Sequence, residues 1–152
     1  MKKLRSLFVA LLLFAIAFPA LAETTTTEEM PVDVEVTEKM FLAQISDINL
    51  NSEDYLGKVI ALEGMFMTVD YGTGGPVYHL VYRKSPGCCG NDGITGLEVV
   101  WDDPATAFPA ENTWVRAVGT LEQYTEEDMP YLQLSLQSLT PTDKPGLDSV
   151  TQ

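Results

Sequence analysis

Positive charge is scarce in this chain of 152 residues, which has nine Lys and Arg residues against 22 Asp and Glu residues. Nucleic-acid binding requires clustered cations, because the affinity comes largely from phosphate contacts that release counterions. The formal net charge of −13 therefore argues against a nucleic-acid partner. The length suits one small domain, and the apolar fraction of 45% is sufficient for a hydrophobic core.

Catalytic side chains are also few. His79 is the only histidine, so a Ser-His-Asp arrangement would depend on that one residue. A cysteine nucleophile needs a base and cationic surroundings that lower the pKa of its thiol, and the cations nearest to the two cysteines in the sequence are Arg83 and Lys84. We therefore expect a protein without enzymatic activity.

Long apolar runs are missing after the first 22 residues. The chain begins MKKLR, continues with an apolar stretch over residues 7–18, and reaches Ala20-Leu21-Ala22, which is the pattern of a secretory signal peptide. An uncleaved anchor is the alternative, but residues 7–22 are few for a bilayer of about 30 Å. We predict a signal peptide over residues 1–22, export to the periplasm or the extracellular space of a bacterium, and no stable membrane span after cleavage.

Cleavage after Ala22 makes the exported chain still more acidic. It removes three cations (Lys2, Lys3 and Arg5) and no acid, so six cations against 22 acids leave a net charge of −16. Such acidity favours solubility and cationic partners.

The next segments form a tether and a helix. Residues 23–36 are acidic and rich in threonine, which predicts a tether with a possible edge strand over residues 32–36. Phe41, Ile45 and Ile48 then recur at the spacing of one helix face, and Thr37 is a candidate N-cap.

A period of two then predicts five strands, over residues 58–69, 77–84, 97–101, 113–123 and 131–139. Gly64 lies in the middle of the first strand and suggests a bulge or sharp bend, which lets one long strand pair at both ends and close a small barrel. We therefore expect an all-β protein with a five-stranded OB-like barrel and a short N-terminal helix over residues 37–141, followed by a flexible tail over residues 142–152. A five-stranded meander or open sandwich is the alternative.

Both cysteines, Cys88 and Cys89, lie side by side in the loop SPGCCGNDG of residues 85–93. Neighbouring cysteines close only a tiny ring, so their disulfide would add little stability through chain entropy and would strain the peptide between them. Three interpretations stay open: thiolate ligands of a metal, a strained redox-active vicinal disulfide, and small buried side chains in a tight loop.

The metal hypothesis names Zn²⁺, which takes Cys, His and carboxylate ligands in a tetrahedron. Cys88 and Cys89 would supply two ligands, and Asp92 and His79 are the candidates for the others. Simpler roles exist for both: a lone histidine on a strand is commonly a packing residue, and Asn91-Asp92-Gly93 is ordinary turn chemistry.

Two further groups of residues are candidate binding elements. The acidic turn of residues 126–128 would lie between the fourth and fifth strands, beside the usual ligand face of an OB-fold, but its spacing matches no calcium loop and favours a solvated turn. Four aromatic side chains offer stacking surface or core packing: Tyr71, Tyr78, Tyr82 and Trp101.

Three segments carry a resemblance to a known family: DYLGKVIALEG over residues 54–64, CCGND over residues 88–92, and WVRAVGTL over residues 114–121. Residues 51–140 resemble a bacterial envelope family of unknown function that has a Cys-Cys-x-x-Asp signature. Its members pair with a predicted permease and often lie beside zinc-uptake genes. The resemblance implies an OB-like domain at the cell envelope, a link to zinc handling and an envelope protein partner.

The sequence thus predicts an exported OB-like binding module that binds a divalent transition metal through the Cys-Cys loop. The alternative is a protein-interaction module of the cell envelope in which the cysteine pair is structural or redox-active.

Overall fold

A computed structural model of the chain describes residues 31–72, 74–86 and 93–150. Its elements are β1 (Val34–Val36), a 3₁₀ turn (Glu38–Met40), α1 (Phe41–Leu50), a second 3₁₀ turn (Ser52–Asp54), β2 (Val59–Asp70), β3 (Val77–Ser85), β4 (Gly93–Val100), β5 (Trp114–Glu126) and β6 (Met129–Pro141).

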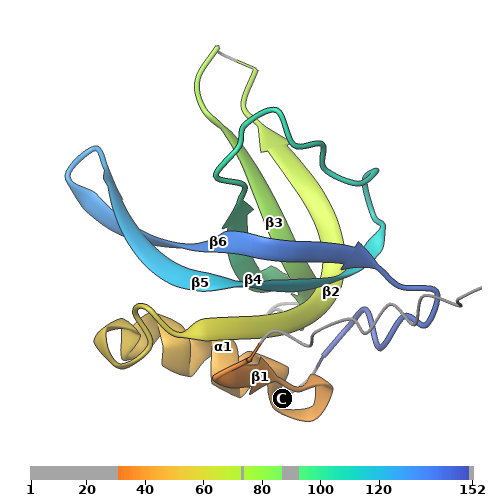
Figure 1. The fold of residues 1–152 in the computed structure, drawn as a ribbon. Coiled ribbons are helices and arrows are strands. Elements are labelled where there is room, and N and C mark those ends of the chain that lie inside the picture. Colours follow the sequence, from red (N-terminus) through yellow and green to blue (C-terminus); the bar gives the residue numbers. More distant parts are fainter. Residues whose placement is uncertain (1–30, 73, 87–92, 151–152) are drawn as a thin grey trace, which may run out of the picture.

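The strands β2 to β6 form a closed barrel (Figure 1). They lie in the order β2-β3-β4-β6-β5, and β5 also pairs with β2, which closes the sheet on itself. Within the barrel only β4 and β6 pair in parallel, so the connection between β4 and β5 crosses an end of the barrel. The prediction of a five-stranded barrel with one short helix is confirmed.

The long strand β2 joins two neighbours because its two halves pair separately. Val59–Met65 pairs with β5, and Met65–Asp70 pairs with β3. Gly64 lies at the change from one partner to the other, where a Cβ atom would lie 2.5 Å from the carbonyl oxygen of Tyr82. The central glycine therefore lies where β2 changes partner, which is the double pairing that the sequence predicted for this strand.

Helix α1 covers one end of the barrel and completes the core (Figure 1). The predicted apolar face is confirmed, because Phe41, Ile45 and Ile48 are all buried. The core residues of the barrel strands alternate along each strand, as a period of two requires: Ile60, Leu62, Phe66, Val81, Leu97, Val99, Val115, Ala117, Leu121, Leu134 and Leu136.

Thr37 is the N-cap residue of the first 3₁₀ turn, but it does not form the side-chain capping hydrogen bond that such a residue can provide. Its side chain caps no helix; instead, the N–H of Thr37 donates to Oε1 of Gln44 at 2.8 Å. Gln44 Nε2 donates in turn to the carbonyl of Glu35 at 2.9 Å. Three 3₁₀ residues after Thr37 delay the start of α1, so a side chain from within the helix satisfies the backbone at this junction.

Both ends of the described chain add to the barrel. β1, which lies in the predicted tether, pairs in parallel with β2 at Val34↔Ile60 to Val36↔Leu62. A flexible tail is predicted over residues 142–152, but residues 142–150, the part that the structure describes, include a fixed segment at their end. The N–H of Val150 donates to the carbonyl of Lys84 at 2.9 Å, and the Val150 side chain is buried in the core. Hydrogen bonds from Arg83 and Lys84 to Leu147 and Asp148 join the buried Val150 side chain in holding this segment, in spite of the prolines and the glycine before it.

Candidate functional site

The proposed cysteine ligands lie in the connection between β3 and β4. Cys88, Cys89 and Asp92 are outside the described residues. The described register of the hairpin runs to Ser85↔Gly93, so residues 86–92 are the whole connection. Across the last pairs, Thr95 Oγ1 donates to Ser85 Oγ at 3.2 Å. Within residues 31–72, 74–86 and 93–150, no group of three or more His, Cys, Asp or Glu side chains is arranged to hold a metal.

His79 lies near the opposite end of β3. It is six residues before Ser85, a distance of about 20 Å along a strand that rises about 3.3 Å per residue. Its ring stacks on Phe108 with 3.8 Å between centroids, and on Phe66 at 5.7 Å. Its Nδ1 atom lies 3.3 Å from Oγ1 of Thr68. The structure therefore places His79 in an aromatic cluster and does not bring it to the end of the strand that leads to the cysteines.

This position predicts a pH-dependent stability. Burial lowers the pKa of His79 below its ordinary value, and the carboxylate of Glu111 opposes this only in part. The unfolded chain then takes up a proton near pH 6.5, before the folded protein does, so stability is lost as the pH falls below that value. We expect the decrease in Tm between pH 7.5 and pH 5.5 to be smaller in His79→Gln than in the wild-type protein. Equal decreases in thermal melts of the two proteins would show that His79 does not contribute.

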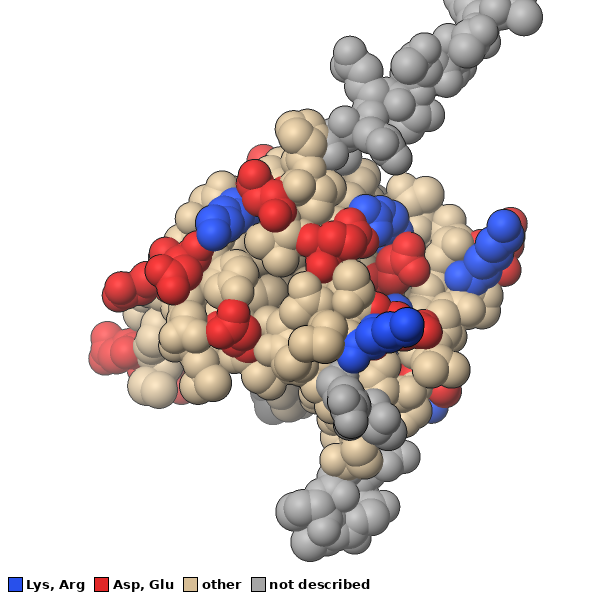
Figure 2. Space-filling model, turned by 90° about the horizontal axis from the view of Figure 1, so that it is seen from below, with Lys and Arg blue, Asp and Glu red and all other residues tan. Residues whose placement is uncertain are grey.

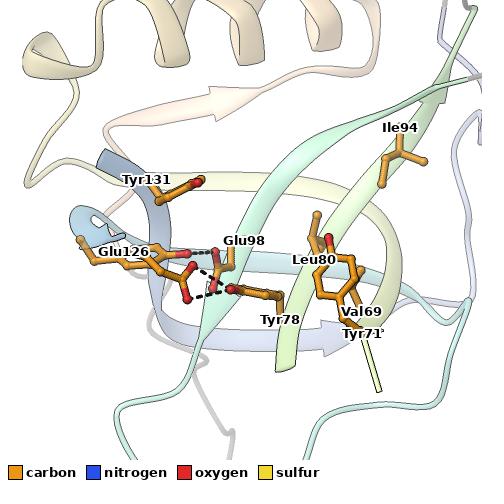
Figure 3. Close-up of a pocket in the computed structure, with 9 residues that line it drawn as sticks. Val69, Tyr71, Tyr78, Leu80, Ile94, Glu98, Glu126 and Tyr131 are labelled. Atoms are coloured by element: carbon orange, nitrogen blue, oxygen red, sulfur yellow. Dashed lines mark hydrogen bonds between the residues drawn. The ribbon is translucent and has the colours of Figure 1, made fainter. Parts of the chain in front are cut away.

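A pocket of about 330 Å³ lies on a different face of the barrel. We call it the tyrosine–glutamate pocket (Figure 3). Its walls come from β3, β4, the end of β2 and the hairpin of β5 and β6, and its lining residues are Val69, Tyr71, Tyr78, Leu80, Ile94, Glu98, Tyr124, Glu126 and Tyr131.

Strand alternation directs these side chains outward. Val81 and Leu97 point into the core, so their neighbours Leu80 and Glu98, which face each other across β3 and β4, lie on the outer side of the barrel. OB-fold proteins bind ligands on this side, between the loop after the first barrel strand and the loop between the fourth and fifth. Those loops correspond here to the β2–β3 and β5–β6 connections, whose flanking residues line the pocket.

Two tyrosine hydroxyl groups orient the two carboxylates of the pocket. Tyr78 Oη donates to the carboxylate of Glu126, with oxygen distances of 2.7 and 2.8 Å, and Tyr124 Oη donates to Oε2 of Glu98 at 2.7 Å. The bond to Glu126 raises the pKa of Tyr78 to about 12, and burial together with the bond to Glu98 raises the pKa of Tyr124. Both phenols therefore keep their protons at neutral pH and remain donors.

Glu98 is affected both by burial and by the neighbouring carboxylate. Burial is the main cause that raises the pKa of Glu98; the bond from Tyr124 opposes it, and the negative charge of Glu126 adds to it. Neither Glu98 nor Glu126 takes part in the ion pairs found in the described part of the chain, in which Arg83, Lys84 and Arg116 are the cations. Seen from below, the molecule likewise shows its cations beside acidic side chains (Figure 2). The pocket thus holds two carboxylates and, among its described neighbours, no cation to balance them.

Aromatic rings form the rim of the pocket. Tyr124 and Tyr131 stack across the β5–β6 hairpin with centroids 5.6 Å apart, and Tyr71 meets the ring of Tyr78 edge-on at 6.3 Å. Tyr71 is 73% exposed and Tyr131 is 46% exposed, so ring surface is open to a ligand. Ile94 extends this apolar rim along β4.

Only part of this pocket is predictable from the sequence. Composition indicates Tyr71 and Tyr78 as stacking residues and Glu126 as part of an acidic turn, whereas no sequence pattern indicates Glu98, Tyr124 or Tyr131. Their contacts depend on the pairing of β4 with β6 and of β5 with β6, which no local pattern reports.

The fold and the pocket define a small OB-like β-barrel domain with a ligand-sized depression on its outer face. A family model described as the DUF1980 C-terminal domain matches residues 20–147. The chain belongs to this family, a bacterial family of uncharacterised function. The predicted membership of an uncharacterised bacterial family is thereby confirmed. Comparison with curated proteins gave no match. No helix in the described part of the chain is sufficiently long and apolar to cross a bilayer.

Proposed function

We propose that this protein is an exported, non-enzymatic binding module that holds one Zn²⁺ ion with Cys88, Cys89 and Asp92. The observation that supports the proposal is the register of the β3–β4 hairpin through Ser85↔Gly93. Because these two residues pair across the hairpin, the seven residues between them begin and end close together. Three potential ligands therefore belong to one short segment that is anchored at both ends on a rigid sheet.

The chemistry of these side chains suits zinc. Thiolates bind Zn²⁺ at about 2.3 Å and carboxylates at about 2.0–2.2 Å, usually in a tetrahedron. His79 is engaged with Thr68 and Phe108 near the far end of β3, so it is not part of the proposed ligand set. The fourth position is then filled by water or by a group from a partner. An open position of this kind suits a protein that passes a metal to an envelope partner, in keeping with the family resemblance to proteins beside zinc-uptake genes.

Native mass spectrometry of the reduced protein tests the proposal. We expect one zinc ion per wild-type chain after incubation with Zn²⁺ and removal of excess metal, because two thiolates dominate the affinity. The double variant Cys88→Ser/Cys89→Ser should lose this zinc, and Asp92→Asn should retain less than the wild-type protein.

His79→Gln is the matched control, and it should bind as much zinc as the wild-type protein. Equal zinc in the wild-type protein and the double serine variant would overturn the proposal. The cysteine pair would then be a vicinal disulfide or a packing feature of an interaction module, and thiol titration before and after mild reduction would separate these two.

A further inference from the structure

The tyrosine–glutamate pocket is polarised. Glu98 and Glu126 lie at one end together with Tyr131, whereas Val69, Leu80 and Tyr71 lie at the other (Figure 3). A ligand that fills it must therefore offer a positive or hydrogen-bond-donating head to the first end and an apolar stem to the second.

The acidic end of the pocket favours a ligand with a positive charge. Two like charges in a partly buried pocket repel each other, and a bound cation removes that repulsion and gains attraction to both carboxylates. Each carboxylate already accepts a hydrogen bond from a tyrosine, so both are oriented before a ligand arrives. An anionic ligand such as a nucleic acid would meet repulsion on the face where other OB-folds bind it.

The rings select an organic cation over a metal ion. The electron-rich face of an aromatic ring attracts an ammonium or guanidinium group within about 6 Å of the ring centre. Calcium requires six to eight oxygen ligands, and the pocket provides two carboxylates, of which both oxygens of Glu126 and Oε2 of Glu98 already accept from phenol groups. The volume of about 330 Å³ is at the lower end of the range of small-molecule sites.

We propose that this pocket binds an organic cation: an ammonium or guanidinium head on a short apolar stem. Glu98 and Glu126 hold the head, the rings of Tyr78 and Tyr131 lie beside it, and Leu80 and Val69 receive the stem. The site is independent of the proposed zinc site, because it shares no residue with the β3–β4 connection. The same head group occurs in a free amine and at the end of a lysine or arginine side chain of a partner protein.

Titration of the protein with n-butylammonium chloride, followed by backbone amide NMR, tests the inference. We expect saturable shifts at residues of the pocket, and much weaker shifts with n-butanol, which has the same stem without the charge. Glu98→Gln and Glu126→Gln should each weaken binding by about three- to tenfold, since each keeps the shape of the side chain and removes one charge.

Two control variants separate the pocket from the general acidity of the protein. Glu122→Gln removes one charge from an exposed position on β5 that does not line the pocket, and binding should change by less than about twofold. Tyr131→Leu keeps both charges and removes a ring, and it should weaken binding as the glutamate variants do.

The double variant Cys88→Ser/Cys89→Ser should bind n-butylammonium like the wild-type protein, so failure of the zinc proposal and failure of this one are distinguishable.

Four results would each overturn the inference. Two concern the ligand: butanol binds as tightly as butylammonium, or Ca²⁺ binds more tightly than the amine. The other two are an equal loss of binding in Glu122→Gln and Glu98→Gln, and the absence of any saturable shift. A capped Gly-Lys-Gly peptide distinguishes the two sources. If it binds at least as tightly as butylammonium, the site takes a side chain of a partner protein; if only the amine binds, the site takes a free amine.

Discussion

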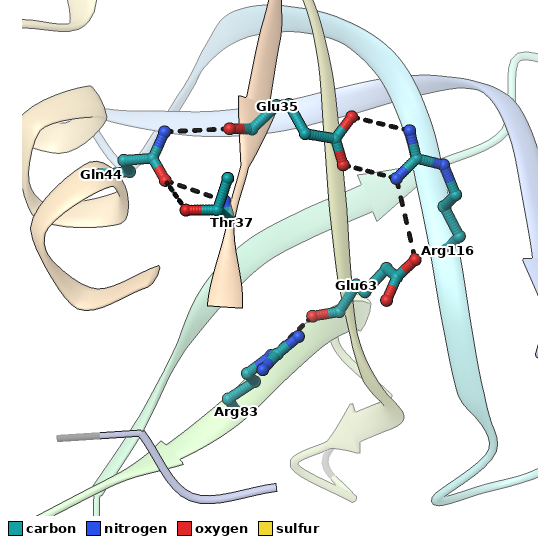
Figure 4. Close-up of polar contacts among 6 residues, drawn as sticks. All are labelled: Glu35, Thr37, Gln44, Glu63, Arg83 and Arg116. Carbon is teal, nitrogen blue, oxygen red and sulfur yellow. Dashed lines mark hydrogen bonds and ion pairs between the residues drawn. The ribbon is translucent and has the colours of Figure 1, made fainter. Parts of the chain in front are cut away.

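Replacement of Arg83 by methionine is expected to lower the free energy of unfolding by about 3 kcal/mol. The Arg83 side chain is 2% exposed and is the only buried charged group among the described residues. Its Nε donates to the carbonyl of Glu63 at 2.8 Å (Figure 4). Its Nη1 donates to the Glu38 carboxylate at 3.0 Å and to the carbonyl of Leu147 at 3.1 Å.

The size of the effect follows from the number of segments that meet at this guanidinium. It joins β3 and β2 to the first 3₁₀ turn and to the C-terminal segment, and it lies over the rings of Phe41 at 5.0 Å and Trp114 at 4.9 Å. Methionine fills similar space but leaves two carbonyl groups without their donor. Glu38 is 41% exposed and can be rehydrated, which keeps the expected loss at the lower end for a buried ion pair.

Urea unfolding followed by far-UV circular dichroism measures this loss. Lys84→Met is the matched control, because Lys84 is the next residue, is 45% exposed, and forms a surface ion pair with Asp148 at 3.3 Å. Its removal should change the free energy of unfolding by less than about 1 kcal/mol. If the Arg83 and Lys84 variants are equally stable, the buried guanidinium does not hold these segments together.

The second large effect is expected for Gly96→Ala. Gly96 pairs with Tyr82, and a Cβ atom on it would lie 2.1 Å from the carbonyl oxygen of Val81 and 2.7 Å from Cα of Tyr82. Both contacts are with backbone atoms, so the strands must separate to make room. We expect a loss of about 3 kcal/mol in the free energy of unfolding, at the upper end of the range for overpacked cores.

Gly93→Ala provides the control on the same strand. Among the described residues, a Cβ atom at Gly93 would meet the Ser85 hydroxyl at 3.5 Å, an ordinary contact, so this variant should unfold within about 0.5 kcal/mol of the wild-type protein. The comparison uses urea unfolding of both variants. A Gly96→Ala variant as stable as Gly93→Ala would show that β3 and β4 can separate at this point without cost.

Much of the barrel was predictable because it depends on local patterns. The period of two over residues 113–123 and 131–139 predicts one inward face on each strand. The structure buries Val115, Ala117, Leu121, Leu134 and Leu136 on these faces and half-buries Leu132. The strand ends were less predictable. The third strand was expected over residues 97–101 but begins at Gly93, since hydrogen bonds to β3 continue through a segment whose composition is that of a loop.

The candidate sites were likewise predictable only where they depend on neighbouring residues. The cysteine pair was recognisable in the sequence because a disulfide between adjacent cysteines adds little stability. The partnership of Glu98 with Tyr124 could not be foreseen, because 26 residues separate them and only the closure of the barrel brings them together. His79 was a reasonable ligand candidate by residue type, and its stacking on Phe108 depends on a connection without regular structure.

The sequence by itself determined the acidity of the protein, its strand periodicity, the glycine at which β2 bends and the placement of both cysteines in one short loop, because these are properties of composition and of near neighbours. Only the tertiary structure decided which outward-facing side chains share the pocket and that Arg83 joins four segments. Those contacts link residues far apart in the chain, and they follow from strand pairing, which is selected by burial of the whole core.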